Sequence, residues 1–164
     1  MDSLTPTAVI VLGLLEFGDA TPYDLKTRVA DTVGSFWSVP HSALYAEPER
    51  LAKAGLVAER REQGGRRRRE FSITAAGRRA LEAWRAEPAA GLAELRDPAL
   101  LKVFFGADPA RMAPAQLAAH RPKLAHYEAI KAHDDGSGPR GPFLGLEAGL
   151  RHQREWIAYW EALL

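Results

Sequence analysis

The chain contains no cysteine, only two methionines and no long hydrophobic run. Without cysteine it can form neither a disulfide nor a thiolate metal site. The apolar run near the N-terminus is short, lacks a preceding basic segment and is soon followed by Glu16. Neither a signal peptide nor a membrane-spanning helix is therefore expected, and the cytoplasm is the expected location.

Motifs that carry catalysis are also missing. There is no Gly-x-Ser-x-Gly elbow, no glycine-rich phosphate loop and no His-Glu-x-x-His pair. His120, His126 and His133 are spaced by six and seven residues, which does not match the i,i+4 pair that binds a metal on one helix face. The sequence therefore predicts a protein that is not an enzyme and that holds no cofactor or metal.

The composition is that of a soluble globular protein, with 46% apolar and 26% charged residues. A chain of 164 residues forms one domain or two small ones. Two halves of about 80 residues would each be marginally stable alone, because small domains bury a smaller fraction of their surface. Mutual packing or oligomerisation is therefore expected.

Two helices are predicted in the first 34 residues from a cap-then-proline pattern. Thr5 or Ser3 caps the first helix, which is apolar nearly all round and is therefore expected to be buried on more than one side. Thr21-Pro22 begins the second helix, and Gly34 ends it. The apolar positions of the second helix are Tyr23, Leu25, Val29 and Val33.

A third helix is predicted to begin with Ser38 as its cap and Pro40 at its start, and to end at Gly55. Leu44, Leu51 and Ala54 are its expected inward positions. Pro48 falls within this pattern, where its missing N–H removes a hydrogen bond to the Leu44 carbonyl. A bend at Pro48, or an irregular first turn there, is expected.

After Gly55 the hydrophobic period changes from 3.6 to 2, and two short runs flank Gly64-Gly65, which is typical of a β-hairpin. Alternation places Arg67 and Arg69 on the face of Phe71 and Ile73, and Arg66 and Arg68 on the opposite face. Thr74 then caps a fourth helix that buries Leu81 and Trp84. Phe36 and Trp37, before the third helix, are likewise expected in the core.

The order helix, helix, helix, hairpin, helix is that of a winged helix-turn-helix domain, here residues 1–87. The fold class is therefore predicted as mainly α with a small β-hairpin. Residues 88–164 have a different texture and are predicted as a C-terminal helical dimerisation region, which could also sense an effector.

Within residues 88–164, Asp97-Pro98 begins a short helix, Pro114 begins a longer one that Pro122 interrupts, and 134–142 forms a flexible connector. The last segment carries apolar residues at coiled-coil spacing, and Gln153 fills the one missing position. This seam needs a helical partner, either within the chain or from a second copy. The predicted dimerisation residues are Phe143, Leu146, Leu150, Ile157, Trp160 and Leu164.

Three pieces of the first half are distinctive, namely "TPYDLKTRV", "FWSVPHSALYAEPERLAKAGLV" and "RRRREFSITAAGRRALEAW". Together they resemble the PadR family of bacterial transcriptional regulators over about residues 4–86. They carry the pairs Tyr23/Leu25, Phe36/Trp37, Leu44/Tyr45, Gly55/Leu56 and Arg66/Arg68, followed by Ser72, Ile73, Thr74 and Gly77. Ala46, Pro48 and Ala52 depart from the commoner family pattern.

The resemblance implies a homodimer that binds a roughly palindromic operator in double-stranded DNA and represses transcription, often until a small-molecule effector binds near the junction of the two regions. It also implies that the C-terminal helices, usually with the first helix, form the dimer interface. A different class of function stays open, in which the winged helix serves protein–protein assembly without direct DNA binding and its basic wing is solvated surface.

The candidate DNA contacts fall into two groups. Base readout is expected from the exposed start of the third helix, through His41, Ser42 and Tyr45. Phosphate contacts are expected from Tyr23, Lys26, Ser38, Arg66 and Arg68. Six arginines and one glutamate in residues 60–69 give a local excess of five positive charges, although the whole chain carries only +1. Arg67 and Arg69 are instead expected to pair with Glu59 or Glu70.

Overall fold

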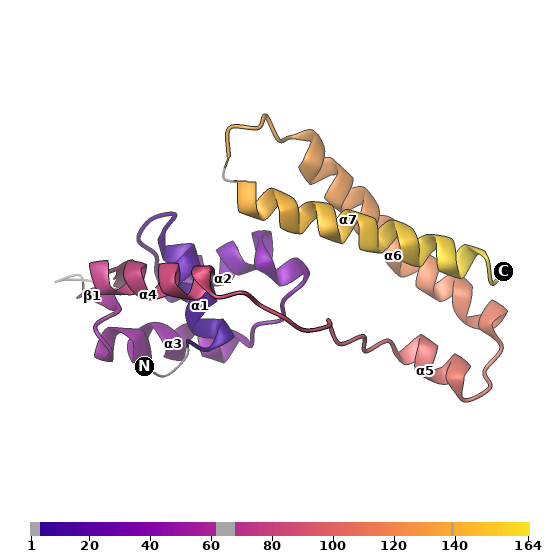
Figure 1. The fold of residues 1–164 in the computed structure, drawn as a ribbon, viewed down its shortest axis with the longest axis horizontal. Coiled ribbons are helices and arrows are strands. Elements are labelled where there is room, and N and C mark those ends of the chain that lie inside the picture. Colours follow the sequence, from indigo (N-terminus) through magenta and orange to yellow (C-terminus); the bar gives the residue numbers. More distant parts are fainter. Residues whose placement is uncertain (1–3, 62–67, 139) are drawn as a thin grey trace. The chain divides into compact units, whose positions relative to one another are not determined.

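The computed structural model describes residues 4–61, 68–138 and 140–164, and the chain divides into two compact units, Met1–Gly91 and Leu92–Leu164 (Figure 1). We call these the N-terminal unit and the C-terminal unit. The described residues are mainly helical with one two-stranded hairpin, which confirms the predicted fold class. No helix within these ranges is long and apolar enough to cross a membrane.

The N-terminal unit has the element order of a winged helix. Its elements are α1 (Pro6–Leu15), α2 (Pro22–Asp31), the 3₁₀ turn η1 (Val33–Ser35), α3 (His41–Lys53), β1 (Val57–Arg61), β2 (Arg69–Ile73) and α4 (Ala75–Ala86).

Helix α1 forms the centre of this unit, because α2, α3, α4 and β2 all pack against it. Thr5 caps it by accepting a hydrogen bond from the Ala8 N–H at 3.2 Å. The expected burial on several sides is confirmed, and the buried residues of α1 are Ala8, Val11, Leu12, Leu14 and Leu15.

Helix α2 begins with a capping box. The Asp24 N–H donates to the Thr21 hydroxyl at 3.2 Å, and the Thr21 N–H donates to the Asp24 carboxylate at 2.9 Å. Of the four apolar positions assigned to this helix, Leu25 and Val29 are buried, Tyr23 is exposed and Val33 lies beyond the helix, in η1. The helix ends at Asp31 and not at Gly34, since the chain tightens into η1 after it.

Helix α3 starts at His41, and Pro40 occupies its N-cap position without a side-chain hydrogen bond, so the prediction that Ser38 caps it is wrong. Leu44 and Leu51 are fully buried as predicted, whereas Ala54 is exposed. The helix runs continuously through Pro48, which is itself buried. The alternative prediction, that Pro48 lies in an irregular first turn, is therefore also wrong. Apolar burial of Pro48 between Leu44 and Leu51 offsets the missing hydrogen bond.

The hairpin strands pair antiparallel, with Val57 opposite Ile73 and Arg61 opposite Arg69. This confirms both predicted strands, while the Gly64-Gly65 turn lies outside the described residues. Ala20 adds a bridge to the other edge of β2, where its N–H donates to the Phe71 carbonyl at 3.0 Å and its carbonyl accepts from the Phe71 N–H at 2.9 Å. The side chain of Phe71, which belongs to β2, is fully buried.

Helix α4 is tied to the end of α3 through its cap. The Thr74 hydroxyl accepts from the Gly77 N–H at 3.0 Å and donates to the Gly55 carbonyl at 2.8 Å. Gly77 and Leu81 form its buried side.

Three aromatic residues predicted for the core are exposed instead, namely Phe36 (67%), Trp37 (46%) and Trp84 (47%). Phe36 and Trp37 follow η1 in the loop before α3, where Val33 and Val39 on either side of them pack against the core and the two aromatic side chains stay exposed. Trp84 lies on the buried side of α4, but in its last turn, beyond the layer filled by Leu81.

The C-terminal unit consists of α5 (Pro98–Phe104), α6 (Pro109–Ala132) and α7 (Arg140–Glu161). Asp97 and Asp108 cap α5 and α6. Helix α6 begins five residues before Pro114 and continues through Pro122, so the predicted start and interruption are both wrong. The predicted connector is also shorter than expected, because α7 takes up its last residues.

Helices α6 and α7 lie side by side and supply the helical partner that the seam requires (Figure 1). Leu150 and Trp160 are fully buried, and Trp160 packs with Ala99, Ala113 and Leu117 of the same chain. The Oε1 atom of the buried Gln153 lies 2.6 Å from Nδ1 of His120, which accounts for the polar residue at this position.

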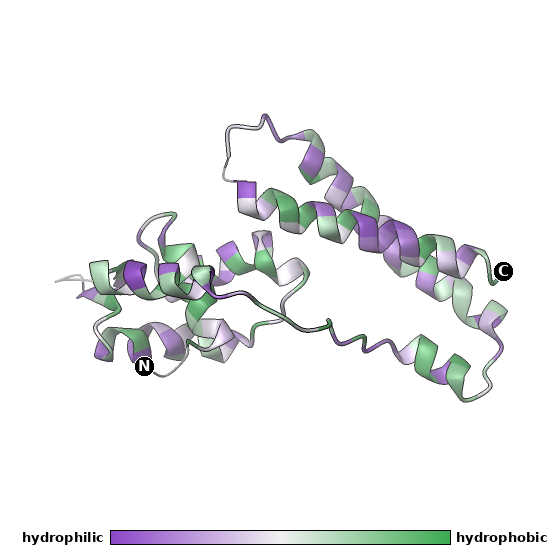
Figure 2. Cartoon of the chain, viewed as in Figure 1, coloured by the Kyte–Doolittle hydropathy of each residue, from purple (hydrophilic) through white to green (hydrophobic). Residues whose placement is uncertain are grey.

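Other apolar side chains of this unit stay uncovered. Phe143, Leu146 and Ile157 are half-buried and Leu164 is exposed. Helix α5, largely green in Figure 2, exposes Leu101 (60%), Phe104 (81%) and Phe105 (78%), the last just after its end.

Candidate nucleic-acid interface

One face of α3 is free of the core and carries polar side chains. The core takes Leu44, Pro48 and Leu51 from this helix, at spacings of four and three residues. At the same helical period His41, Tyr45 and Glu49 lie on the face beside these core residues, and Ser42 lies further round the helix. His41 and Ser42 are exposed, and half of the Tyr45 surface is exposed. The residues predicted to read bases are therefore accessible.

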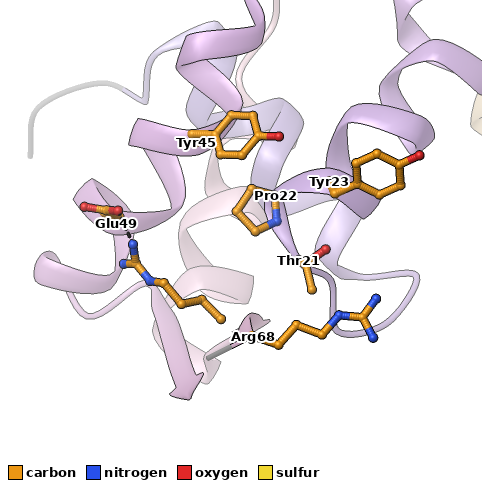
Figure 3. A pocket seen from close by; sticks show the side chains of 7 residues that line it. Thr21, Pro22, Tyr23, Tyr45, Glu49 and Arg68 are labelled. Atoms are coloured by element: carbon orange, nitrogen blue, oxygen red, sulfur yellow. Dashed lines mark hydrogen bonds and ion pairs between the residues drawn. The ribbon is translucent and has the colours of Figure 1, made fainter. Parts of the chain in front are cut away.

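Tyr23, Tyr45 and Arg68 come together although they lie far apart in the sequence. They line an open hollow of about 380 Å³ between the start of α2, the middle of α3 and the start of β2 (Figure 3). Tyr23 is 66% exposed, since α2 buries Leu25 and Val29 and leaves Tyr23 outside. The hollow is lined by Thr21, Pro22, Tyr23, Tyr45, Glu49, Arg68 and Arg69.

The remaining candidates do not line this hollow. Lys26 is half-exposed on α2, and Ser38, His41 and Ser42 are exposed before and at the start of α3. Arg66 lies outside the described residues, as does Arg67, which was expected to form a structural ion pair.

Arg68 is exposed and lies next to the capping box of α2. It borders a second, smaller hollow together with Thr21, Asp24, Arg60 and Glu70. The pKa of Asp24 is lowered, first by its hydrogen bonds from the Thr21 backbone and hydroxyl and then by the charges of Arg68 and Arg28. The guanidinium group of Arg68 therefore lies close to the N-terminus of α2. Among the described residues, the ion pairs at this end of β2 involve Arg69 and not Arg68.

Arg69 has a different role, because it ties the hairpin to α3. Its Nε donates to Glu59 Oε1 at 2.7 Å, its Nη2 donates to Glu59 Oε2 at 3.2 Å, and its Nη1 donates to Glu49. The guanidinium also lies 5.5 Å from the centre of the Phe71 ring. The predicted pairing of Arg69 with Glu59 is thus present, whereas Glu70 pairs with Arg60.

These hydrogen bonds strongly stabilise the charged form of Glu59. Donation from Arg69, and then from Arg61, lowers the pKa of Glu59 from 4.5 to about 2. The same pairing raises the pKa of Arg69. Both groups therefore stay ionised at neutral pH, and the link between β1, β2 and α3 persists there.

Two residues with clear roles were missed by the sequence analysis. Arg28 donates to the carbonyls of Leu14, Gly18 and Asp19 at 2.9, 2.8 and 3.0 Å, and so satisfies the C-terminal end of α1. Glu49 lies four residues after Tyr45 on the exposed face of α3. That spacing indicates its face on α3, but its contact with Arg69 joins residues 20 positions apart and no local pattern indicates it.

The arrangement has the groups that recognise duplex DNA. The hydroxyl of Tyr23 on α2 and the guanidinium group of Arg68, just before β2, can hold phosphate oxygens, and a helix with an exposed polar face can enter a major groove. The exposed face of α3 and the hollow beside it belong to one surface of the N-terminal unit.

Two family models match the chain. Residues 11–83 match the transcriptional regulator PadR-like family, and residues 95–164 match the family described as virulence activator alpha C-term. The chain is 25% identical over 169 residues to the negative transcriptional regulator PadR of Bacillus subtilis (strain 168). The match covers 94% of this chain and 93% of that protein.

Solved structures are similar over nearly the full length. Bacillus subtilis PadR in complex with operator DNA has a TM-score of 0.83 at 23% identity, with 95% of each chain covered. The same protein in complex with p-coumaric acid has a TM-score of 0.76 at 22% identity, with 97% of this chain and 95% of that one covered. The Vibrio cholerae virulence activator AphA has a TM-score of 0.70 at 27% identity, with 96% and 95% covered. These likenesses confirm the winged-helix fold.

Proposed function

This chain belongs to the PadR-like family of transcriptional regulators, and we propose that it binds double-stranded operator DNA as a homodimer and represses transcription. The observation that carries the proposal is the joining of Tyr23, Tyr45 and Arg68 around one hollow beside the exposed face of α3. No relative named above is described as an enzyme. The similar PadR of Bacillus subtilis is named a negative transcriptional regulator and was solved with operator DNA.

In the proposed complex, α3 enters the major groove and places His41, Ser42 and Tyr45 at base edges. Tyr23, Lys26 and Ser38 hold the phosphate backbone, and Arg68 does so from the wing. We propose the same role for Arg66. Dimer symmetry would bring two such helices to half-sites about one helical turn apart, on a pseudo-palindromic operator.

The first prediction concerns Arg68. Changing Arg68 to alanine is expected to weaken operator binding about 10-fold, because one charge-assisted phosphate contact is lost. The slope of log affinity against log salt should also fall by about 1. Fluorescence anisotropy with labelled promoter DNA at several salt concentrations measures both quantities.

Arg151→Ala is the matched control, since Arg151 is an exposed arginine on α7 of the C-terminal unit and its loss changes the net charge equally. It should leave affinity and slope unchanged. A wild-type protein that ignores duplex DNA at low salt, with no effector present, would overturn the proposed function and favour a protein–protein assembly role.

Dimerisation is proposed to use the apolar surface that the C-terminal unit leaves uncovered. Leu150 and Trp160 of the predicted seam are already buried within their own chain. We propose that they hold the interface helices in place without contacting the second copy themselves. The exposed Phe104 and Phe105, whose ring centres are 5.2 Å apart, have the apolar surface that a second copy would cover. We propose that Phe143, Leu146, Ile157 and Leu164 extend this surface.

The second prediction tests that interface. Changing Phe104 and Phe105 together to serine should convert the dimer to monomers in sedimentation velocity at micromolar concentration, since two large apolar contacts per protomer are lost. Arg151→Ala should leave the sedimentation coefficient unchanged. A double variant that still sediments as a dimer would place the interface elsewhere.

A small-molecule effector is the third part of the proposal. The similar PadR of Bacillus subtilis was solved with p-coumaric acid, which makes a phenolic carboxylic acid the first probe. Titrating p-coumaric acid into the protein–DNA complex and following the anisotropy distinguishes release from retention of the DNA.

A further inference from the structure

Glu49 is an acidic side chain on a surface proposed to face a polyanion. It lines the hollow with Tyr23, Tyr45 and Arg68, and its side chain is 43% exposed. It lies eight residues after His41 and four after Tyr45, so all three occupy one face of α3. A carboxylate there cannot hold phosphate, since like charges repel.

The carboxylate is held in place and not left to move freely. Glu49 accepts a hydrogen bond from Nη1 of Arg69, and Glu59 accepts two more from the same guanidinium group. The dashed line at Glu49 in Figure 3 marks an interaction of this side chain at the edge of the hollow. The planar guanidinium thereby fixes the direction of the Glu49 carboxylate. Among the described residues, the hydrogen bonds shown for Glu49 use Oε1 alone. Its Oε2 is therefore the atom that can accept from a partner.

Glu59 provides an informative contrast. It binds the same arginine, but from β1, and it does not line the hollow. Its side chain is only 19% exposed, against 43% for Glu49. Glu59 is shared between Arg69 and Arg61, so Glu49 supplies the second carboxylate of this ion-pair cluster. What distinguishes Glu49 from Glu59 is its position, since only Glu49 lines the hollow beside Tyr45 and is well exposed there.

We infer that Glu49 is a specificity-determining residue that accepts a hydrogen bond from the N4 amino group of a cytosine in the major groove, with Arg69 as its positioning residue. Glutamate accepts from cytosine N4, whereas guanine presents only acceptors at this edge and would be repelled. Glu49 lies about one α-helical turn beyond Tyr45, in the middle of α3. In a helix seated in the major groove, a side chain at this position can reach bases next to those that Tyr45 reads. This inference rests on the proposed DNA-binding function.

Selection of bound sequences from random duplexes tests it, with the wild type compared with Glu49→Gln. The wild type should prefer C·G over the other pairs at one position of each half-site by about 10-fold. Glu49→Gln should lose that preference or shift it toward adenine, which glutamine reads through N6 and N7. Preferences at the other positions should persist.

Glu59→Gln is the matched control, since it removes the same charge from the other partner of Arg69. It should keep the cytosine preference, and thermal unfolding of both variants shows that they are folded. A second measurement uses the selected operator with N4-methylcytosine at this position, which should weaken wild-type binding more than Glu49→Gln binding.

Two outcomes distinguish a failure of the proposed DNA binding from a failure of the inference about Glu49. If the wild type binds no duplex, the proposed function fails. If it binds, but Glu49→Gln and Glu59→Gln change affinity for all sequences alike with no shift at one position, Glu49 only supports the wing and the inference is wrong.

Discussion

Replacing Gly77 with alanine is expected to lower the free energy of unfolding of the N-terminal unit by about 3 kcal/mol. A Cβ at this position would lie 2.1 Å from the Leu56 carbonyl oxygen and 2.9 Å from Cγ1 of Ile73. The first neighbour is backbone, held where α3 turns into β1, so α4 would have to move away from the sheet. For a unit of this size, 3 kcal/mol corresponds to a fall in Tm of more than about 10 °C.

Gly13→Ala gives the matched control for this expectation. Gly13 also lies in a helix, and nothing lies within 4 Å of a Cβ built on it. The same chemical change there should be neutral or stabilise by about 0.5–1 kcal/mol, because alanine is the better helix former. Thermal unfolding followed by circular dichroism compares the two variants. Equal Tm values would show that the packing of α4 on the turn after α3 is not tight.

Changing Trp160 to alanine is expected to cost the C-terminal unit about 4 kcal/mol, because this side chain is fully buried. It packs with Ala99 of α5 and with Ala113 and Leu117 of α6, so its loss leaves a cavity where all three helices meet. Hydrogen exchange of α6 and α7 should accelerate strongly, while exchange of α1 to α4 should stay the same. The total free energy of unfolding of a unit of this size is small, so this loss is a large part of it.

Trp160→Phe keeps most of the apolar contact and removes the indole N–H, which has no acceptor among the described residues. It should therefore cost no more than about 1 kcal/mol. The pair of variants also distinguishes two uses of the seam. If Trp160→Ala leaves the exchange of α6 and α7 unchanged and only dissociates the dimer, Trp160 contacts a second copy and not its own chain.

The exposed aromatic residues show why sequence pattern alone misplaced part of the N-terminal unit. Phe36 and Trp37 were expected in the core from their hydrophobicity, yet α2 ends at Asp31 and in the segment that follows it is Val33 and Val39 that pack against the core. Trp84 was expected on the buried side of α4, and it follows the buried Leu81 by three residues, yet 47% of its surface is exposed in the last turn of the helix. Periodicity gives the direction of a side chain from its helix axis, and not how far the neighbouring elements extend.

The candidate interface was foreseeable in part. The exposure of His41, Ser42 and Tyr45 follows from the period of α3, once Leu44 and Leu51 are recognised as core. The role of Glu49 was not foreseeable, because it depends on Arg69, which lies 20 residues away on another strand.

Local chemistry in the sequence by itself determined the caps at Thr5, Thr21 and Thr74, the switch from helical to strand period after Gly55, and thereby the winged helix. These signals act over a few residues and need no knowledge of distant contacts. Only the tertiary structure decided that the seam of α7 packs on α6 of the same chain, that Pro48 is tolerated inside α3, and that Arg69 binds Glu49 of α3 in addition to the predicted Glu59. Each of these depends on which element is brought alongside, since burial and ion pairing are properties of neighbours in space and not of neighbours in sequence.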